Sequence, residues 1–227
     1  MEKILIETKG LGRAFPIIGR EPFWALHNVN LTVPEGKLTI IKGKSGSGKT
    51  TIMNILGGLD RPTEGTVIFG GKDLFAMSDR ELDIMRRKEI GFVFQSVALV
   101  PMMTAYENVE FALRLAGYKG DRKARAEECL KMVGLGGRMS HMPSEMSGGE
   151  QQRVAIARAI SHKPRIIFAD EPTAELDTNT GIQVVKIFRE LSASEGLTFV
   201  MNTHDPGVMP LGDQAYELEG GELIVNG

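Results

Sequence analysis

A glycine-rich segment, residues 43–50, has the composition and spacing of a loop that binds phosphate. It fits the pattern G-x-x-x-x-G-K-[ST], in which glycines allow backbone N–H groups to turn towards phosphate oxygens. Lys49 would reach the β- and γ-phosphates, the Thr50 hydroxyl would bind Mg²⁺, and the following helix would add the positive end of its dipole. A flexible Gly/Ser loop is the alternative, but a predicted strand (38–41) precedes the segment and a predicted helix (50–59) follows it, as phosphate binding requires. The loop residues are Gly43, Lys44, Ser45, Gly46, Ser47, Gly48, Lys49 and Thr50.

Two carboxylates follow an apolar predicted strand, residues 166–169. Asp170 stands at the end of that strand, where it could hold Mg²⁺ directly or through water. Glu171 comes one residue later, so its side chain turns differently and could polarise an attacking water as general base. In isolation, a strand end followed by a polar turn at Pro172 is the better explanation of the pair. The phosphate loop elsewhere in the chain favours the catalytic interpretation.

A third segment, residues 147–153, combines a helix start with two consecutive glycines. Ser147 and Glu150 have the spacing of a capping box, which explains those two residues structurally. It does not explain Gly148 and Gly149, because glycine lowers helix stability. Glycines at a helix start expose N–H groups to an approaching anion, so the segment predicts a second phosphate site.

The elements that must position these residues alternate between β-rich and helical segments. Strand–helix–strand spacing predicts an α/β fold with a largely parallel sheet and helices on both faces. A helical middle, residues 104–134, is predicted to be inserted into this core. The predicted strands are residues 4–8, 29–33, 38–41, 66–69, 166–169 and 197–201; the predicted helices are 50–59 and 180–194, and a hairpin is predicted at 215–225.

Composition excludes several classes of protein. The chain has 227 residues and a net charge of −2, so a broadly basic surface for nucleic acid is not expected. A single cysteine, Cys129, excludes an internal disulfide and suits a reducing compartment. We expect no signal peptide and no membrane span, because the first residues are charged and the longest uncharged run, residues 90–106, contains polar residues and proline. A soluble intracellular globule is therefore expected.

The order of these segments resembles that of ATP-binding cassette (ABC) ATPases over nearly the whole chain. The matching positions are residues 43–50, Gln95, residues 147–151, Asp170, Glu171, Asp177 and His204. Closer still, residues 51–60, 91–95, 107–110 and 147–158 resemble the macrolide-exporter and lipoprotein-release subfamily, the MacB/LolD type.

This resemblance implies a P-loop NTPase fold of the ABC ATPase type. Such a fold has a mixed, largely parallel sheet core, an antiparallel β subdomain and an inserted α-helical subdomain. The whole chain would be a single domain, residues 1–227. Its α/β core would comprise about residues 1–90 and 163–227, and its helical subdomain about residues 91–162.

Within the chain's own ATP site, the resemblance implies a role for each matching residue. Gln95 corresponds to a Mg²⁺ ligand that also senses a membrane partner, beside Thr50 and Asp170. His204 corresponds to the switch histidine that contacts the γ-phosphate, although the sequence alone explains it as a turn residue after a strand. Phe15 lies where the family has an aromatic that stacks on adenine. The implied catalytic residues are Lys49, Glu171 and His204, and the implied ATP-binding residues are Phe15, Gly43, Lys44, Ser45, Gly46, Ser47, Gly48, Lys49, Thr50, Thr51 and Gln95, with Phe23 and Trp24 as rivals of Phe15.

The same resemblance implies that ATP is shared between two copies of the chain. Ser147, Gly148 and Gly149 match the signature motif, which contacts the γ-phosphate of ATP held by the other subunit. Asp177 matches the D-loop aspartate at the dimer interface. The expected assembly is therefore a homodimer that clamps two ATP molecules, with Mg²⁺, and opens after hydrolysis.

The implied function is the ATP-hydrolysing subunit of a transporter. It would power export or extraction through a separate permease of the MacB/LolC/LolE type, and would lie in the cytoplasm on the inner face of the membrane. An ABC ATPase that drives a signalling or cell-division regulator without transport is the alternative. DNA-repair members carry long coiled-coil insertions and ribosomal members usually have two cassettes, whereas here one cassette has only about 50 residues between Gln95 and Ser147.

Methionine usage suggests where a permease would bind. Eight of the 12 methionines lie between residues 77 and 146, and methionine suits a surface that receives a partner helix. Val100, Met102 and Met103 are therefore predicted to line a groove for a permease helix; ordinary core packing is the alternative. Two positions depart from the family pattern: Met146 replaces the usual leucine, and Glu175 adds negative charge near the dimer seam.

The remaining reactive side chains are predicted to be structural. Three histidines have no supporting pattern: His27, His141 and His162. Cys129 follows Glu127 and Glu128, whose charge disfavours a thiolate nucleophile.

Overall fold

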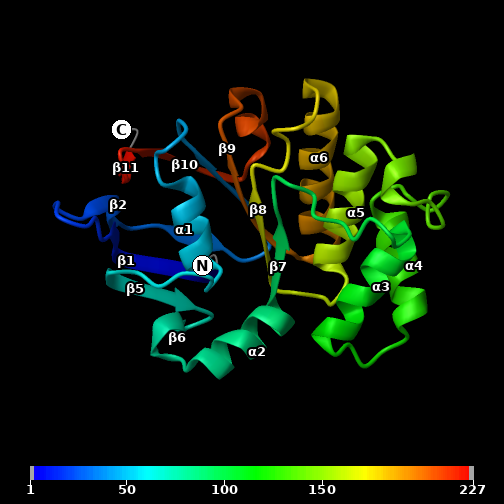
Figure 1. The fold of residues 1–227 in the computed structure, drawn as a ribbon, viewed down its shortest axis with the longest axis horizontal. Helices are drawn as coiled ribbons and strands as arrows, with labels where there is room; N and C mark the ends of the chain where they lie inside the picture. The colour runs from blue at the N-terminus through cyan, green and yellow to red at the C-terminus, as the bar shows by residue number, and fades with distance from the viewer. Residues whose placement is uncertain (1–2, 225–227) are drawn as a thin grey trace.

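The computed structural model describes residues 3–224 and contains two β-sheets (Figure 1). The larger sheet has the strand order β11-β10-β4-β9-β8-β7, in which β10 to β7 run parallel and β11 is antiparallel to β10. This confirms the predicted α/β fold with a largely parallel sheet. The strands are β4 (Leu38–Lys42), β7 (Ile90–Val93), β8 (Ile166–Asp170), β9 (Thr198–Thr203), β10 (Gln214–Glu219) and β11 (Glu222–Ile224); residue 225 of the predicted hairpin lies outside the described residues.

The second sheet is antiparallel, with the order β2-β1-β5-β6 and β3 paired to β1. The prediction of one strand over residues 29–33 was wrong, because β2 ends at Val29 and β3 begins at Thr32. The Thr8 hydroxyl bridges this break: it donates to the Val29 carbonyl at 3.0 Å and accepts from the Leu31 N–H at 2.9 Å. A buried side chain thus takes the place of ladder hydrogen bonds. The strands are β1 (Ile4–Phe15), β2 (Phe23–Val29), β3 (Thr32–Pro34), β5 (Glu64–Phe69) and β6 (Lys72–Asp73).

Different helices cover the two faces of the parallel sheet. Successive side chains of a strand point to opposite faces, so Phe199 and Val200 of β9 enter different cores. Phe199 stacks on Phe188 of α6 (Thr178–Glu195), with ring centroids 4.8 Å apart. Val200 shares the other core with residues of α1 (Lys49–Leu56). In Figure 1, α1 and the antiparallel strands lie on one side of the parallel strands, and α5 and α6 lie on the other.

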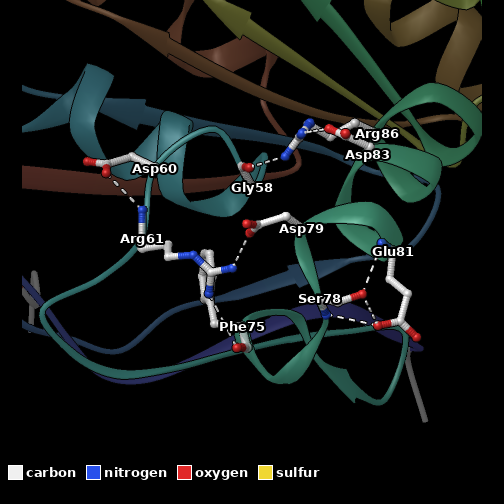
Figure 2. Close-up of polar contacts among 9 residues, drawn as sticks. All are labelled: Gly58, Asp60, Arg61, Phe75, Ser78, Asp79, Glu81, Asp83 and Arg86. Atoms are coloured by element: carbon white, nitrogen blue, oxygen red, sulfur yellow. Dashed lines mark hydrogen bonds and ion pairs between the residues drawn. The ribbon is translucent and has the colours of Figure 1, made fainter.

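A helix at Asp79–Glu89, α2, was missed by the sequence analysis. It begins with a capping box in which Ser78 N–H donates to Glu81 Oε2 at 2.8 Å and Glu81 N–H donates to Ser78 Oγ at 3.4 Å (Figure 2). The Ser-x-x-Glu spacing is a signal that could have predicted the helix. Figure 2 also shows Arg86 donating to the Gly58 carbonyl, at 2.6 Å. This contact ties α2 to the turn that ends α1.

Three helices gather at the far side of β7: α3 (Ala105–Ala116), α4 (Arg122–Met132) and α5 (Gly148–Ile160) (Figure 1). They pack on one another, and α5 also contacts β7. The division into a core and a helical subdomain near residues 91 and 162 stays a prediction. Short 3₁₀ helices occupy Leu74–Ala76, Pro143–Glu145 and Pro206–Leu211. Among the described residues, no helix is both long enough and apolar enough to cross a membrane.

Candidate functional site

The glycine-rich loop connects β4 to α1 at the carboxyl end of the parallel sheet. Gly48 is the N-cap of α1 and has φ +101°, in the left-handed region where a side chain would be strained. A Cβ there would also lie 2.5 Å from the Ala25 carbonyl oxygen. Glycine is therefore required for the chain to turn from the loop into the helix, and this turn presents the first N–H groups of α1.

Lys49 is nearly buried and folds back over this loop. Its ammonium donates to the Gly43 carbonyl at 2.8 Å and to the Lys44 carbonyl at 3.0 Å. It also lies 3.4 Å from Glu171 Oε1, and the two side chains are 6% and 17% exposed. A cationic group is thus held against the loop, beside an acidic side chain that follows β8.

Glu171 follows β8 in a strained backbone conformation, with φ +47°. Its second oxygen, Oε2, lies 2.5 Å from His204 Nδ1. The carboxylate therefore bridges Lys49 and His204, residues that lie 155 positions apart in the sequence. The structure brings the three predicted catalytic side chains together.

Asp170, the last residue of β8, lies beside the start of α1. Thr50 Oγ1 donates to Asp170 Oδ1 at 3.3 Å. A hydroxyl and a carboxylate oxygen therefore converge, and these are the hard oxygen ligands that Mg²⁺ prefers. Within residues 3–224, no group of three or more His, Cys, Asp or Glu side chains could hold a metal alone. These residues fit a Mg²⁺ ion that takes its other ligands from phosphate and water.

A residue that sequence reasoning missed contacts both acidic residues. Asn202 of β9 is fully buried. Its Nδ2 donates to Asp170 Oδ1 at 2.5 Å, and its Oδ1 accepts from the Glu171 N–H at 2.6 Å. The pairing of Asp170 with Asn202 in the parallel register of β8 and β9 places it there. Nothing in the amino-acid pattern signalled this contact.

A cavity of about 410 Å³ opens beside the loop and brings most of the predicted ATP-binding residues together. Phe15 and Phe23, paired across β1 and β2, form its aromatic wall. Trp24, the third aromatic considered, instead stacks on His27 with ring centroids 5.5 Å apart. Arg13 lies over the Phe15 ring, 4.5 Å from its centroid. The lining residues are Phe15, Phe23, Ala25, Ser45, Gly46, Gly48, Lys49, Thr50, Thr51, Gln95 and Glu171.

Gln95 lines this cavity, and a half-buried arginine supports the segment that follows it. Gln95 Nε2 donates to Glu175 Oε1 at 3.3 Å. Arg158 of α5 donates to the carbonyls of Ala98 at 2.7 Å and Val97 at 3.1 Å. Burial lowers the pKa of Arg158 below its ordinary value. The segment after Gln95 is thereby connected to α5.

The second predicted phosphate site does not line this cavity. Ser147 caps α5 as predicted: its N–H donates to Glu150 Oε2 at 2.9 Å, and the Glu150 N–H donates to Ser147 Oγ at 3.3 Å. The Ser147 N–H and hydroxyl both donate to the Glu150 carboxylate, and these two hydrogen bonds lower its pKa. Asp177 caps α6, accepting from Thr180 Oγ1 at 2.6 Å and from two backbone N–H groups, and these bonds lower its pKa. In this single chain, Ser147 and Asp177 thus act as helix caps, and their roles towards a second ATP stay predictions.

The other reactive residues do not line this cavity. Burial raises the pKa of the Cys129 thiol to about 11, and burial has a larger effect than the neighbouring Glu128 charge that the sequence suggested. His162 is half-buried, with Nε2 3.0 Å from the Ile90 carbonyl oxygen, and its partial burial lowers its pKa. His141 lies against Arg138, 3.1 Å away.

The chain is similar to known proteins in both sequence and structure. The model of the family described as ABC transporter matches residues 26–174. The ABC transporter ATP-binding protein YknY of Bacillus subtilis is 47% identical over 221 residues, which cover 97% of this chain and 95% of that protein. The macrolide export ATP-binding/permease protein MacB of Burkholderia cenocepacia is 43% identical over the whole chain, which spans 33% of MacB. A solved dimeric structure of the ATP-binding cassette MJ0796, in a post-hydrolysis state bound to ADP and Pi, superposes with a TM-score of 0.87 at 43% identity and 97% coverage of both chains.

Proposed function

The chain belongs to the ABC transporter family as an ATP-binding, ATP-hydrolysing subunit, and on that premise we propose how its residues perform the reaction. ATP binds in the cavity beside the phosphate loop, and two copies of the chain clamp two ATP molecules. Hydrolysis then drives a separate membrane permease. The observation that carries this proposal is the convergence of Lys49, Glu171 and His204 at one end of a cavity whose wall contains Phe15.

The loop and its lysine bind the phosphates. The N–H groups at the start of α1 and the Lys49 ammonium supply positive charge where the β- and γ-phosphates lie. Phosphate oxygens replace the two carbonyl oxygens and the carboxylate that Lys49 contacts now. Phe15, in the wall of the cavity, stacks on adenine. Phe23 lies beside Phe15 as its partner in the pairing of β1 with β2.

Glu171 acts on the attacking water. Its carboxylate accepts a proton while the water oxygen attacks the γ-phosphorus, and the bond to the bridging oxygen breaks to release ADP and phosphate. His204 contacts the γ-phosphate and holds Glu171 from the solvent side. Thr50, Asp170 and Gln95 hold Mg²⁺, which neutralises charge on the phosphates when it is bound.

A second copy completes the site. The signature segment, residues 147–149, does not line the cavity of its own chain. The similarity to a dimeric cassette supports an arrangement in which this segment of one copy reaches the γ-phosphate held by the other. Asp177 then lies at the seam between the copies.

A groove of about 220 Å³ between the parallel sheet and the helices suits a permease helix. Leu115 of α3 is 60% exposed at this groove, and Arg158, which supports the segment after Gln95, also lines it. A partner helix here can therefore influence Gln95. The fusion of both activities in MacB supports a permease partner, of the MacB/LolC/LolE type, and a place on the inner face of the membrane. The lining residues are Arg86, Arg87, Ile90, Gly91, Phe92, Ala112, Leu115, Ala116, Arg158, Ala159 and His162.

The segment predicted from methionine usage, residues 100–103, does not line this groove. Met102 is 84% exposed, and Val100 and Met103 are half-buried. Asn108 fixes this segment, because its side chain accepts from the Val100 N–H at 2.8 Å and donates to the Met103 carbonyl at 2.9 Å. A role of Met102 and Met103 beside the docked helix remains part of the proposal.

Two experiments test the function. ATP hydrolysis by the purified chain should stop in Glu171→Gln, and wild-type turnover by this variant would refute the catalytic assignment. Leu115→Glu should uncouple ATPase activity from a co-expressed permease and leave the isolated subunit active. Ile18→Glu is the matched control, since Ile18 is fully exposed in the β1–β2 loop, away from the groove. Equal effects of both substitutions would remove the groove as the docking site.

A further inference from the structure

We propose that Asn202 is a positioning residue for ATP hydrolysis, which orients Asp170 and holds Glu171 in its productive conformation. This inference rests on the proposed roles of those two acidic residues. Asn202 lies on β9, opposite Asp170 in the parallel pairing with β8. No part of its side chain is exposed to solvent. It therefore acts through the two acidic residues and does not touch the substrate.

One side chain makes a separate contact with each acidic residue. The amide Nδ2 donates to Asp170 Oδ1 at 2.5 Å, and the amide Oδ1 accepts from the Glu171 N–H at 2.6 Å. A buried amide is costly unless both its donor and its acceptor groups are paired. Here both are paired with residues of the site, so the contact fixes their relative positions.

The contact with Asp170 sets the direction of its carboxylate. The oxygen that accepts from Asn202 also accepts from Thr50 Oγ1, at 3.3 Å. Asn202 thus holds this oxygen towards the start of α1, where two of the three proposed Mg²⁺ ligands, Thr50 and Asp170, meet. An apolar side chain at position 202 would leave the carboxylate free to rotate away from Thr50.

The contact with Glu171 stabilises a strained turn. A left-handed conformation is unfavourable for glutamate, and it persists only where surrounding contacts stabilise it. With φ +47°, the chain leaves β8 at this residue, and the side chain reaches Lys49 and His204. Because the Asn202 oxygen accepts the N–H of this residue, the amide stabilises the backbone conformation that places the proposed general base.

Only an amide supplies both contacts at this position. Leucine has a similar shape and supplies neither. Aspartate can accept from the Glu171 N–H but cannot donate to Asp170, and it places a second negative charge beside the first. The two substitutions therefore separate loss of both contacts from loss of the Asp170 contact alone.

The test compares Asn202→Leu and Asn202→Asp with Thr198→Val. Thr198 lies at the other end of β9, is also fully buried, and accepts from the Gly36 N–H at 2.9 Å. The measurements are kcat and KM for ATP, the affinity for a fluorescent ATP analogue with and without Mg²⁺, and urea unfolding. Displacement of catalytic groups by about 1 Å costs about 100-fold in rate, so both Asn202 variants should lose about 100-fold in kcat. Their Mg²⁺-free affinity should stay within about threefold of wild type, and the gain in affinity on adding Mg²⁺ should shrink.

Three results would overturn the proposal. One is a wild-type kcat and Mg²⁺ response in the folded Asn202→Asp variant. Aspartate retains the shape of the asparagine side chain, so this variant tests the proposal even if Asn202→Leu does not fold. Another is a wild-type kcat and Mg²⁺ response in Asn202→Leu. The third is an equal loss of kcat and urea midpoint in Thr198→Val, which would show a general effect of β9. Glu171→Gln is measured in parallel: if it keeps wild-type turnover, the assignment of the base fails, whatever the Asn202 variants do.

Discussion

Substitution of Glu171 by glutamine should change turnover and ATP affinity in opposite directions. The variant loses a general base, which lowers kcat by about 100-fold or more. It also loses the negative charge that faces Lys49 in the nucleotide-free chain, 3.4 Å from the ammonium. ATP must take Lys49 from this carboxylate in order to bind. The substitution therefore removes a competitor of the γ-phosphate.

The size of the affinity gain follows from this ion pair. At 3.4 Å and an effective dielectric constant of about 20, the attraction is about 5 kcal/mol. Desolvation of both charges offsets most of it, and glutamine still accepts a neutral hydrogen bond from Lys49. The net difference is about 1–2 kcal/mol, or about 5- to 30-fold tighter binding of ATP.

The assay is titration with a fluorescent ATP analogue at protein concentrations where the chain is monomeric, beside a phosphate-release assay. Glu219→Gln is the matched control. Glu219 faces Lys44 of the same loop at 3.9 Å, but these side chains are 62% and 90% exposed. An exposed pair contributes little, so this variant should change ATP affinity by no more than about threefold and leave turnover intact.

Either of two results would refute the predicted gain in ATP affinity. Unchanged or weaker ATP binding in Glu171→Gln would mean that the ion pair with Lys49 does not compete with the phosphates. An equal gain in Glu219→Gln would mean that affinity responds to net charge around the loop, without regard to the contact.

Three further predictions follow from other contacts. Phe15→Ala should raise the KM for ATP about tenfold, because it removes a ring from the wall of the cavity. Trp24→Ala removes a ring that does not line the cavity and should leave the KM within about twofold of wild type. Equal effects of the two substitutions would contradict the assignment of Phe15 to adenine. Asn108→Leu should lower the free energy of unfolding by about 2–4 kcal/mol in urea, because it removes the hydrogen-bond partner of the Val100 N–H and of the Met103 carbonyl. Burial raises the pKa of the Cys129 thiol from its unfolded value of 9.0 to about 11. The protonated buried thiol therefore contributes its full stabilisation below pH 9, and this contribution is lost as the pH rises towards 11. The free energy of unfolding of a Cys129→Ala variant, measured against pH, should lack this decline.

Local signals predicted the elements that carry the site. The pattern of residues 43–50 required a strand before it and a helix after it, and β4 and α1 are both present. The Ser147 capping box, with its Glu150, is likewise made within four residues, so sequence was sufficient. The same reasoning failed at residues 29–33, because the break there depends on the hydroxyl of Thr8, more than 20 positions away. A stretch of apolar residues in the sequence gives no sign of a hydrogen bond from a distant strand.

The sequence by itself determined the chemistry of this protein: a phosphate loop, two acidic residues after a buried strand, and a glycine-rich helix start, in an order that identified the family. Spacing is enough for these because each is built from neighbours along the chain. Only the tertiary structure decided which distant groups meet. The parallel register of β8 and β9 places Asn202 against Asp170, and the strained turn at Glu171 brings its carboxylate between Lys49 and His204. Those contacts depend on strand pairing across more than 30 residues, and a pattern of neighbouring residues does not specify which residue of a distant parallel strand lies opposite.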